Sequence, residues 1–120
     1  MLMGENVLKN KSFDFALRCL RLCDELRRRN VPRDLIRQVL RSGTSIGANV
    51  KEGLFAQSKA DFLTKLTIAK KEAAETEYWL ELLHAYKALA DNEAESMLDD
   101  CRSLIKLLVA SCKTLNNRLI

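Results

Sequence analysis

The spacing of apolar residues is the feature that most constrains the fold of this 120-residue chain. Apolar side chains recur at alternating intervals of three and four residues, which places them on one face of an α-helix. The longest run keeps this rhythm for three heptads: Phe62, Leu66, Ala69, Ala73, Thr76, Leu80 and Leu83. Helix breakers are scarce, with one proline and four glycines. The pattern therefore predicts an all-α protein.

Turn and capping residues predict where four helices begin. Ser12 is expected to cap the first helix and Pro32 to begin the second. Ser58 and Asp61 resemble a capping box for the third helix, and Asn92 is expected to cap the fourth. The expected helices span about residues 12–29, 32–55, 58–89 and 92–120. Connections of about two to five residues favour antiparallel neighbours. The expected fold is an antiparallel up-down-up-down four-helix bundle over residues 12–120, after an N-terminal tail at residues 1–11.

The apolar seam of the second helix contains Gly43 and Gly47. Each glycine costs up to about 1 kcal/mol relative to alanine inside a helix. Close approach of a neighbouring helix is the expected compensation.

The first residues lack the basic and then apolar run of a secretory signal, and no segment approaches the ~20 apolar residues that span a bilayer. A cytoplasmic protein without a membrane partner is expected. The cysteines have no CxxC spacing and are expected to act as small apolar side chains in a reducing compartment: Cys19, Cys23, Cys101 and Cys112.

Residues for metal binding and catalysis are sparse. His84 is the sole histidine, and it lacks the Glu-x-x-His pattern of dinuclear bundle sites. Cys19 and Cys23 could reach one metal ion, but a four-ligand site needs two more partners. Ser42 and Thr44 have no nearby base, and the glycine-containing segment around them follows no strand. A non-enzymatic protein without cofactor or metal is therefore expected.

Five polar residues lie where the helical seams turn from apolar to polar: Arg41, Asn49, Glu52, Glu72 and Glu75. Glu72 and Glu75 share a helical row with Trp79, so they should be at least partly buried. A buried carboxylate requires a partner, and Arg41 or Lys51 on the second helix could supply it. The interpretation is an internal network that fixes helix register, and the alternative is a polar pocket for a ligand or an RNA group.

The basic residues are unevenly distributed. Residues 1–60 carry 12 Lys/Arg against 6 Asp/Glu, or +6, and residues 61–120 carry 8 against 10, or −2. Seven arginines surround the turn between the first two helices: Arg18, Arg21, Arg27, Arg28, Arg29, Arg33 and Arg37. Guanidinium groups bind phosphates in bidentate fashion, so this cluster indicates nucleic-acid contact through the backbone. The alternative is a solvated face or ion pairs between protomers.

Helices one and three carry two apolar stripes each, which is more than a single bundle needs. The surplus includes Phe15, Trp79 and Tyr86. Exposed apolar patches of this kind usually mark interfaces. These three residues are therefore predicted to lie in the interface of a homo-oligomer.

Two segments carry a family resemblance: SGTSIGANVKEG at residues 42–53 and DFLTKLTIAKKEAAETEYWLELL at residues 61–83. They resemble the four-helix bundle proteins encoded in 23S rRNA intervening sequences, over roughly residues 12–115. The resemblance implies a ring-shaped homo-oligomer, with a pentamer favoured, and no catalytic residue. The chain is distantly similar to the accessory protein of diversity-generating retroelements, a basic pentameric bundle that works with nucleic acid and a reverse transcriptase. Gly47 departs from the family pattern, where proline or another small residue is frequent, so a straighter second helix is expected.

Two functions are consistent with the sequence. The first is an oligomer that binds RNA or DNA through the arginine cluster. The second is a ring-shaped scaffold that binds a protein partner without touching nucleic acid.

Overall fold

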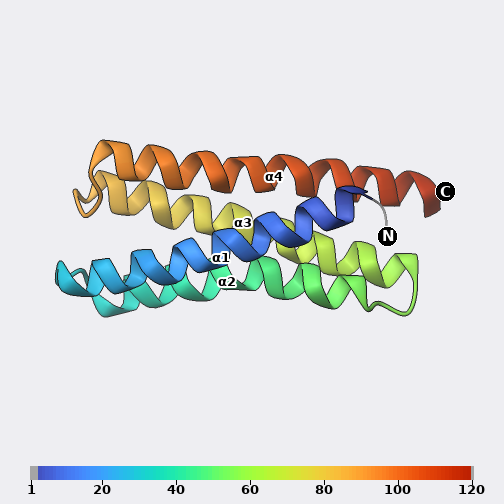
Figure 1. Cartoon of the computed structure of the whole chain (residues 1–120), viewed down its shortest axis with the longest axis horizontal. Coiled ribbons are helices and arrows are strands. Elements are labelled where there is room, and N and C mark those ends of the chain that lie inside the picture. Colours follow the sequence, from blue (N-terminus) through green and yellow to red (C-terminus); the bar gives the residue numbers. More distant parts are fainter. Residues whose placement is uncertain (1–2, 120) are drawn as a thin grey trace.

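The computed structural model describes residues 3–119, and within that range the chain forms four α-helices and no β-strand. They are α1 (Met3–Arg28), α2 (Arg33–Leu54), α3 (Lys59–Ala85) and α4 (Asp91–Leu119). Short turns join them, so successive helices run antiparallel along a body of 48 × 21 × 20 Å (Figure 1). The predicted up-down-up-down four-helix bundle is confirmed.

The helices contact one another in the order of the chain. α2 packs closely on α1 and α3, and α3 packs on α4, whereas α1 and α4 touch least. The backbones of α1 and α3 do not come close to each other within the described residues, so these two helices lie at diagonal corners of the bundle. One end holds the α1–α2 and α3–α4 turns, and the other holds both ends of the chain and the α2–α3 turn (Figure 1).

The predicted start of the first helix at Ser12 is wrong, because α1 begins at Met3. The Ser12 hydroxyl donates to the Lys9 carbonyl oxygen at 3.1 Å, one turn earlier, and does not cap the helix. Leu8 lies in the core. Residues 3–11, expected as a tail, therefore form the first turns of α1. No proline interrupts them, and Leu8 extends the inward-facing row that contains Ser12 and Phe15.

Two turns at the same end of the bundle use left-handed backbone conformations. Asn30 has φ 59° and Lys87 has φ 69°. At α1, the Val31 amide donates to the Leu26 carbonyl and the Asn30 amide to the Arg27 carbonyl. This pair of hydrogen bonds is a Schellman motif, which satisfies the last carbonyls of a helix.

At the end of α3, the Ala88 amide donates to the Leu83 carbonyl and the Lys87 amide to the His84 carbonyl, which is the same motif. The third helix therefore ends at Ala85, although the apolar stripe predicted for it continues to Leu89.

The starts of α3 and α4 are capped by side chains. The Ser58 hydroxyl accepts a hydrogen bond from the Asp61 amide at 3.1 Å, so the cap predicted for the third helix is confirmed. α4 begins at Asp91, before the predicted cap at Asn92. The Glu93 carboxylate accepts a hydrogen bond from the Ala90 amide at 2.9 Å, which satisfies one of the free donors at this helix end.

The close helix approach predicted from the glycines is confirmed. A Cβ atom at Gly43 would lie 2.5 Å from the Cys19 Sγ atom of α1. A Cβ atom at Gly47 would lie 3.2 Å from the Ser12 carbonyl oxygen. The two glycines thus bring α1 and α2 together.

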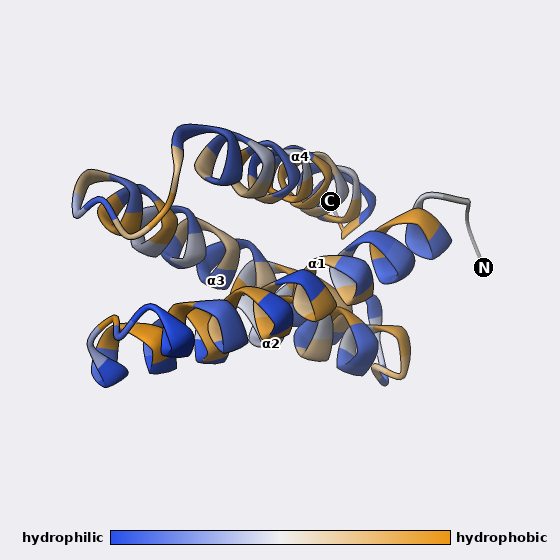
Figure 2. Cartoon of the chain, turned by 60° about the vertical axis from the view of Figure 1, so that its left-hand side comes forward, coloured by the Kyte–Doolittle hydropathy of each residue, from blue (hydrophilic) through white to orange (hydrophobic). Residues whose placement is uncertain are grey.

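The core is apolar, and apolar and polar residues alternate along each helix (Figure 2). Phe15, predicted to lie in an oligomer interface, is only 2% exposed and packs inside the protomer. That prediction is wrong because the stripe containing Phe15 faces the core, whereas Phe13 on the neighbouring stripe is 68% exposed. Trp79 is half-buried against the core, and Tyr86 is 62% exposed.

Candidate nucleic-acid interface

The seven arginines of the predicted cluster fall into two groups, and the first group links α1 to α4. Arg18 donates to the Ser96 hydroxyl at 2.8 Å and pairs with Asp100. Arg29 forms a two-pronged pair with Glu93 at 2.7 and 2.9 Å and also donates to the Ala88 carbonyl at 2.9 Å. Hydrogen bonding to Glu93 raises the pKa of Arg29, and Arg29 lowers the pKa of Glu93. These two arginines serve the fold and are not available to a ligand.

The second group comprises five arginines that we call the arginine surface: Arg21, Arg27, Arg28, Arg33 and Arg37. Three of them pair only with a carboxylate three residues earlier on the same helix, at 2.9 Å for Asp24, 2.8 Å for Glu25 and 3.4 Å for Asp34. Exposed pairs of this type contribute at most a few tenths of a kcal/mol, so a phosphate can displace them. Arg21 and Arg33 form no ion pair within residues 3–119. The arginine surface is therefore free to bind an anion.

Three residues of the arginine surface line a hollow of about 710 Å³ beside the α1–α2 turn. Arg27, Arg33 and Arg37 contribute guanidinium groups, and the aliphatic residues Ile36 and Leu40 contribute apolar surface. The left-handed residue Asn30 and the break at Pro32 set the geometry of this turn. Guanidinium groups bind phosphates in bidentate fashion, so a hollow lined by three arginines suits a phosphate group.

The predicted polar network is only partly present. Arg41 of α2 pairs with Glu72 at 3.1 Å and with Glu75, both on α3. Trp79 donates its indole N–H to the Glu75 carboxylate at 2.9 Å. The pKa of Glu75 is lowered, first by Trp79 and then by Arg41. The predicted pairing of Arg41 with the two partly buried glutamates is confirmed, and Trp79 belongs to the same cluster.

Asn49 and Glu52 do not join this cluster. Asn49 donates to the Ser45 carbonyl of its own helix at 2.8 Å, and Glu52 pairs with Lys65 at 3.3 Å. The sequence placed all five residues near one seam but did not show that Asn49 and Glu52 have other partners. The cluster formed by Arg41, Glu75 and Trp79 therefore joins α2 to α3.

The lowered pKa values of Glu75 and Glu93 predict how stability changes in acid. A carboxyl with a lowered pKa in the folded state stabilises the fold above its ordinary pKa of 4.5 and loses that contribution as the pH falls further. The urea midpoint, followed by far-ultraviolet circular dichroism, should therefore decline below about pH 4.5. The Glu75→Gln/Glu93→Gln variant should be less stable at pH 7, and its urea midpoint should decline less as the pH falls. An unchanged acid profile in the variant would contradict this role.

The remaining reactive groups offer no catalytic arrangement among the described residues. Burial raises the pKa of the Cys19 and Cys101 thiols to about 12, so both stay protonated. The Ser42 hydroxyl is fully buried, donates to the Gln38 carbonyl at 2.8 Å and meets only Thr76. His84 pairs with Asp91 at 2.7 Å on the exposed α3–α4 turn. No cluster of potential metal ligands occurs in residues 3–119.

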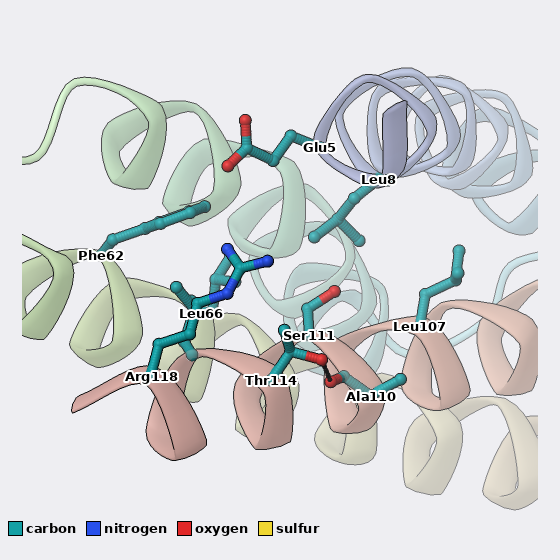
Figure 3. Close-up of a pocket in the computed structure, with 11 residues that line it drawn as sticks. Glu5, Leu8, Phe62, Leu66, Leu107, Ala110, Ser111, Thr114 and Arg118 are labelled. Atoms are coloured by element: carbon teal, nitrogen blue, oxygen red, sulfur yellow. Dashed lines mark hydrogen bonds between the residues drawn. The ribbon is translucent and has the colours of Figure 1, made fainter. Parts of the chain in front are cut away.

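An apolar pocket of about 310 Å³ lies at the opposite end of the bundle from the arginine surface. Figure 3 shows it between the first turns of α1, the start of α3 and the end of α4, with Leu8, Leu66 and Leu107 around it. Glu5 and Arg118 project toward its opening (Figure 3). This pocket was not predicted from the sequence, because residues 1–11 were expected to form a tail. Its lining is mainly apolar, and Glu5 and Arg118 are its charged members.

Within the described range, none of the helices has the length and apolar character that crossing a bilayer requires.

The comparisons with known proteins agree with this fold. Residues 5–110 match the family model described as 23S rRNA-intervening sequence protein. A solved structure from Bacteroides thetaiotaomicron, described as a protein with unknown function from the S23 ribosomal protein family, is 47% identical. The match covers 92% of this chain and 99% of that one, with a TM-score of 0.90. None of the curated proteins matches the chain.

Proposed function

The chain belongs to the 23S rRNA-intervening sequence protein family, and from this premise and the arginine surface we propose that it is a non-enzymatic homo-oligomer that binds nucleic acid, RNA in particular. The observation that carries the proposal is the group of five arginines at the α1–α2 end that no other helix engages. The same stretch of chain carries only three carboxylates, Asp24, Glu25 and Asp34, so the arginine surface has a net positive charge.

Association of several copies would strengthen such binding. A single protomer presents one arginine surface with a modest positive charge. A ring repeats this surface around one axis, and the family resemblance favours a pentamer. Repeated sites on one assembly bind a long polyanion with a high effective local concentration. The oligomer and the nucleic-acid site thus support the same function.

The mode of binding follows from the residue types. The arginine surface contains guanidinium groups and aliphatic neighbours, and no aromatic side chain lines its hollow. Binding should therefore use backbone phosphates without base stacking. It should weaken steeply as the salt concentration rises, because the release of counterions from the nucleic acid then becomes less favourable.

The test is fluorescence anisotropy with a labelled structured RNA at about 50 and 200 mM salt. The Arg33→Ala/Arg37→Ala variant should bind at least about tenfold more weakly, and its logarithmic salt slope should fall by about 1.5. The control is Lys106→Ala/Lys113→Ala, which removes the same charge from exposed positions of α4. Absence of binding by the wild type at low salt, or an equal loss in the control, would contradict the proposal.

A second function is favoured by the exposed aromatic residues Phe13, Tyr78 and Tyr86. In that case the assembly is a ring-shaped scaffold for a protein partner and does not contact nucleic acid. Copurification of one defined protein after nuclease treatment, together with no RNA binding at low salt, would favour this alternative.

A further inference from the structure

The apolar pocket of about 310 Å³ has an interior made of leucines from three helices. Leu8 of α1, Leu66 of α3 and Leu115 of α4 line it, and each is at most 7% exposed. The half-buried residues Phe62 and Leu107 complete the apolar lining (Figure 3). The pocket includes both α1 and α4, the two neighbouring helices that contact each other least. It therefore occupies a place where the bundle itself does not bring the helices close together.

Small residues keep this space open. Gly4 of α1 and both Ala110 and Ser111 of α4 line the pocket. A Cβ atom added at Gly4 would meet no other atom within 4 Å. Protein interiors are otherwise packed so closely that few voids exceed the size of a water molecule. Small-molecule sites occupy roughly 300–1,000 Å³, so this pocket has room for a small apolar ligand.

Two polar groups of α4 at the pocket have no partner in the described part of the chain. Arg118 forms no ion pair or hydrogen bond with residues 3–119, and the Ser111 hydroxyl forms no hydrogen bond with them. The two residues are about two turns apart on α4 and so share one helix face. Arg118 projects toward the opening (Figure 3). Glu5, the other charged residue at the opening, already has an interaction within the protein.

The two parts of the pocket select different parts of a ligand. The leucine-lined interior favours an alkyl chain, because transfer of apolar surface out of water is favourable. The guanidinium group at the opening favours a carboxylate, which it can bind with two parallel hydrogen bonds. A cationic head group would be repelled by Arg118, and a neutral one would not use its charge. The chemistry that matches both parts is an aliphatic carboxylate.

We propose that this pocket binds a free aliphatic carboxylic acid of medium chain length. The alkyl chain lies against Leu8, Leu66 and Leu115. The carboxylate stays at the opening, where Arg118 and the Ser111 hydroxyl donate hydrogen bonds to it. The ligand contacts both α1 and α4, so it strengthens the loosest junction of the bundle. The site lies at the opposite end from the arginine surface and does not depend on nucleic-acid binding.

The first test is isothermal titration calorimetry with hexanoate, heptanoate and octanoate. Each added methylene that enters the pocket should tighten binding by about fourfold. Octanoate should bind one molecule per protomer and raise the unfolding temperature, because the unfolded chain has no pocket. Absence of octanoate binding at millimolar concentration, or an affinity that does not depend on chain length, would overturn the proposal.

The second test fills the pocket from its rim. Ala110 and Val109 are neighbouring exposed residues of α4, and of these two only Ala110 lines the pocket. Ala110→Phe should abolish measurable octanoate binding, whereas the matched control Val109→Phe should leave it unchanged. Far-ultraviolet circular dichroism confirms that both variants are folded. Equal effects of the two variants would place the ligand elsewhere and overturn the proposal.

The third test concerns the charged head group. Arg118→Gln should weaken octanoate binding by about fivefold, the upper range for an exposed ion pair, and should leave the binding of octan-1-ol unchanged. Lys113→Gln removes the same charge from an exposed position of α4 outside the pocket and is the control. Octylammonium should bind the wild type more weakly than octanoate. Tighter binding of octylammonium, or equal effects of the two variants on octanoate, would overturn the assignment of an acid as the ligand.

Discussion

Replacement of Phe15 by alanine is expected to lower the free energy of unfolding of the protomer by about 3–5 kcal/mol. Phe15 is one of the largest fully enclosed side chains in the core and is only 2% exposed. Its removal deletes buried apolar contacts and leaves a cavity that the surrounding helices fill only in part. Urea unfolding followed by circular dichroism measures the change.

The control for this prediction is Phe13→Ala on the same helix. Phe13 is largely exposed, so its truncation should change protomer stability by no more than about 0.5 kcal/mol. Both changes are compared at the same low protein concentration, where any association adds little to stability. Equal losses at the two positions would show that the assignment of inner and outer stripes on α1 is wrong.

Replacement of Gly43 by alanine is expected to destabilise the protein by about 1–3 kcal/mol, although alanine favours helix formation by about 1 kcal/mol over glycine. The added Cβ would lie 2.5 Å from the Cys19 Sγ atom and 3.1 Å from the Cys19 Cβ atom. The clash forces α1 away from α2 or moves Cys19 from its position in the core. The shift in the urea midpoint measures the loss.

Two comparisons separate this clash from a general effect of alanine. Gly4→Ala adds the same methyl group to α1, where no atom lies within 4 Å, and should be neutral or mildly stabilising. Cys19→Ala removes the nearest atom, so the Gly43→Ala/Cys19→Ala double variant should lose less than the sum of the single losses. Strict additivity would contradict a direct contact between these two positions.

The fold was predictable because each helix repeats its apolar rhythm for several turns, and because a proline precedes α2 and side chains cap the starts of α3 and α4. Ser58 illustrates this success, since its hydrogen bond to the Asp61 amide is a local property of the sequence. The error at Ser12 has the same local origin, because serine inside a helix bonds back to a carbonyl as readily as it caps a helix start. The sequence around Ser12 contains no breaker that would decide between the two.

The site was less predictable because it depends on register between helices that are distant in the chain. Arg41 and Glu72 lie on adjacent helices joined by a short turn, so their pairing could be anticipated. Arg18 and Arg29 find partners on α4, 82 and 64 residues away in the sequence. The sequence could not separate these two structural arginines from the five of the arginine surface, because charge alone does not reveal which ones have partners.

The loose junction of α1 with α4 changes how the bundle responds to its ionic surroundings. Backbones approach least along this junction, and Arg18 and Arg29 bridge it with charged, partly solvated contacts to Asp100 and Glu93. Dissolved ions screen such contacts more than they affect apolar packing. The junction between α1 and α4 is therefore the part of the bundle most sensitive to dissolved ions. At high ionic strength, the leucines packed behind this junction should be the first core residues to become exposed to water.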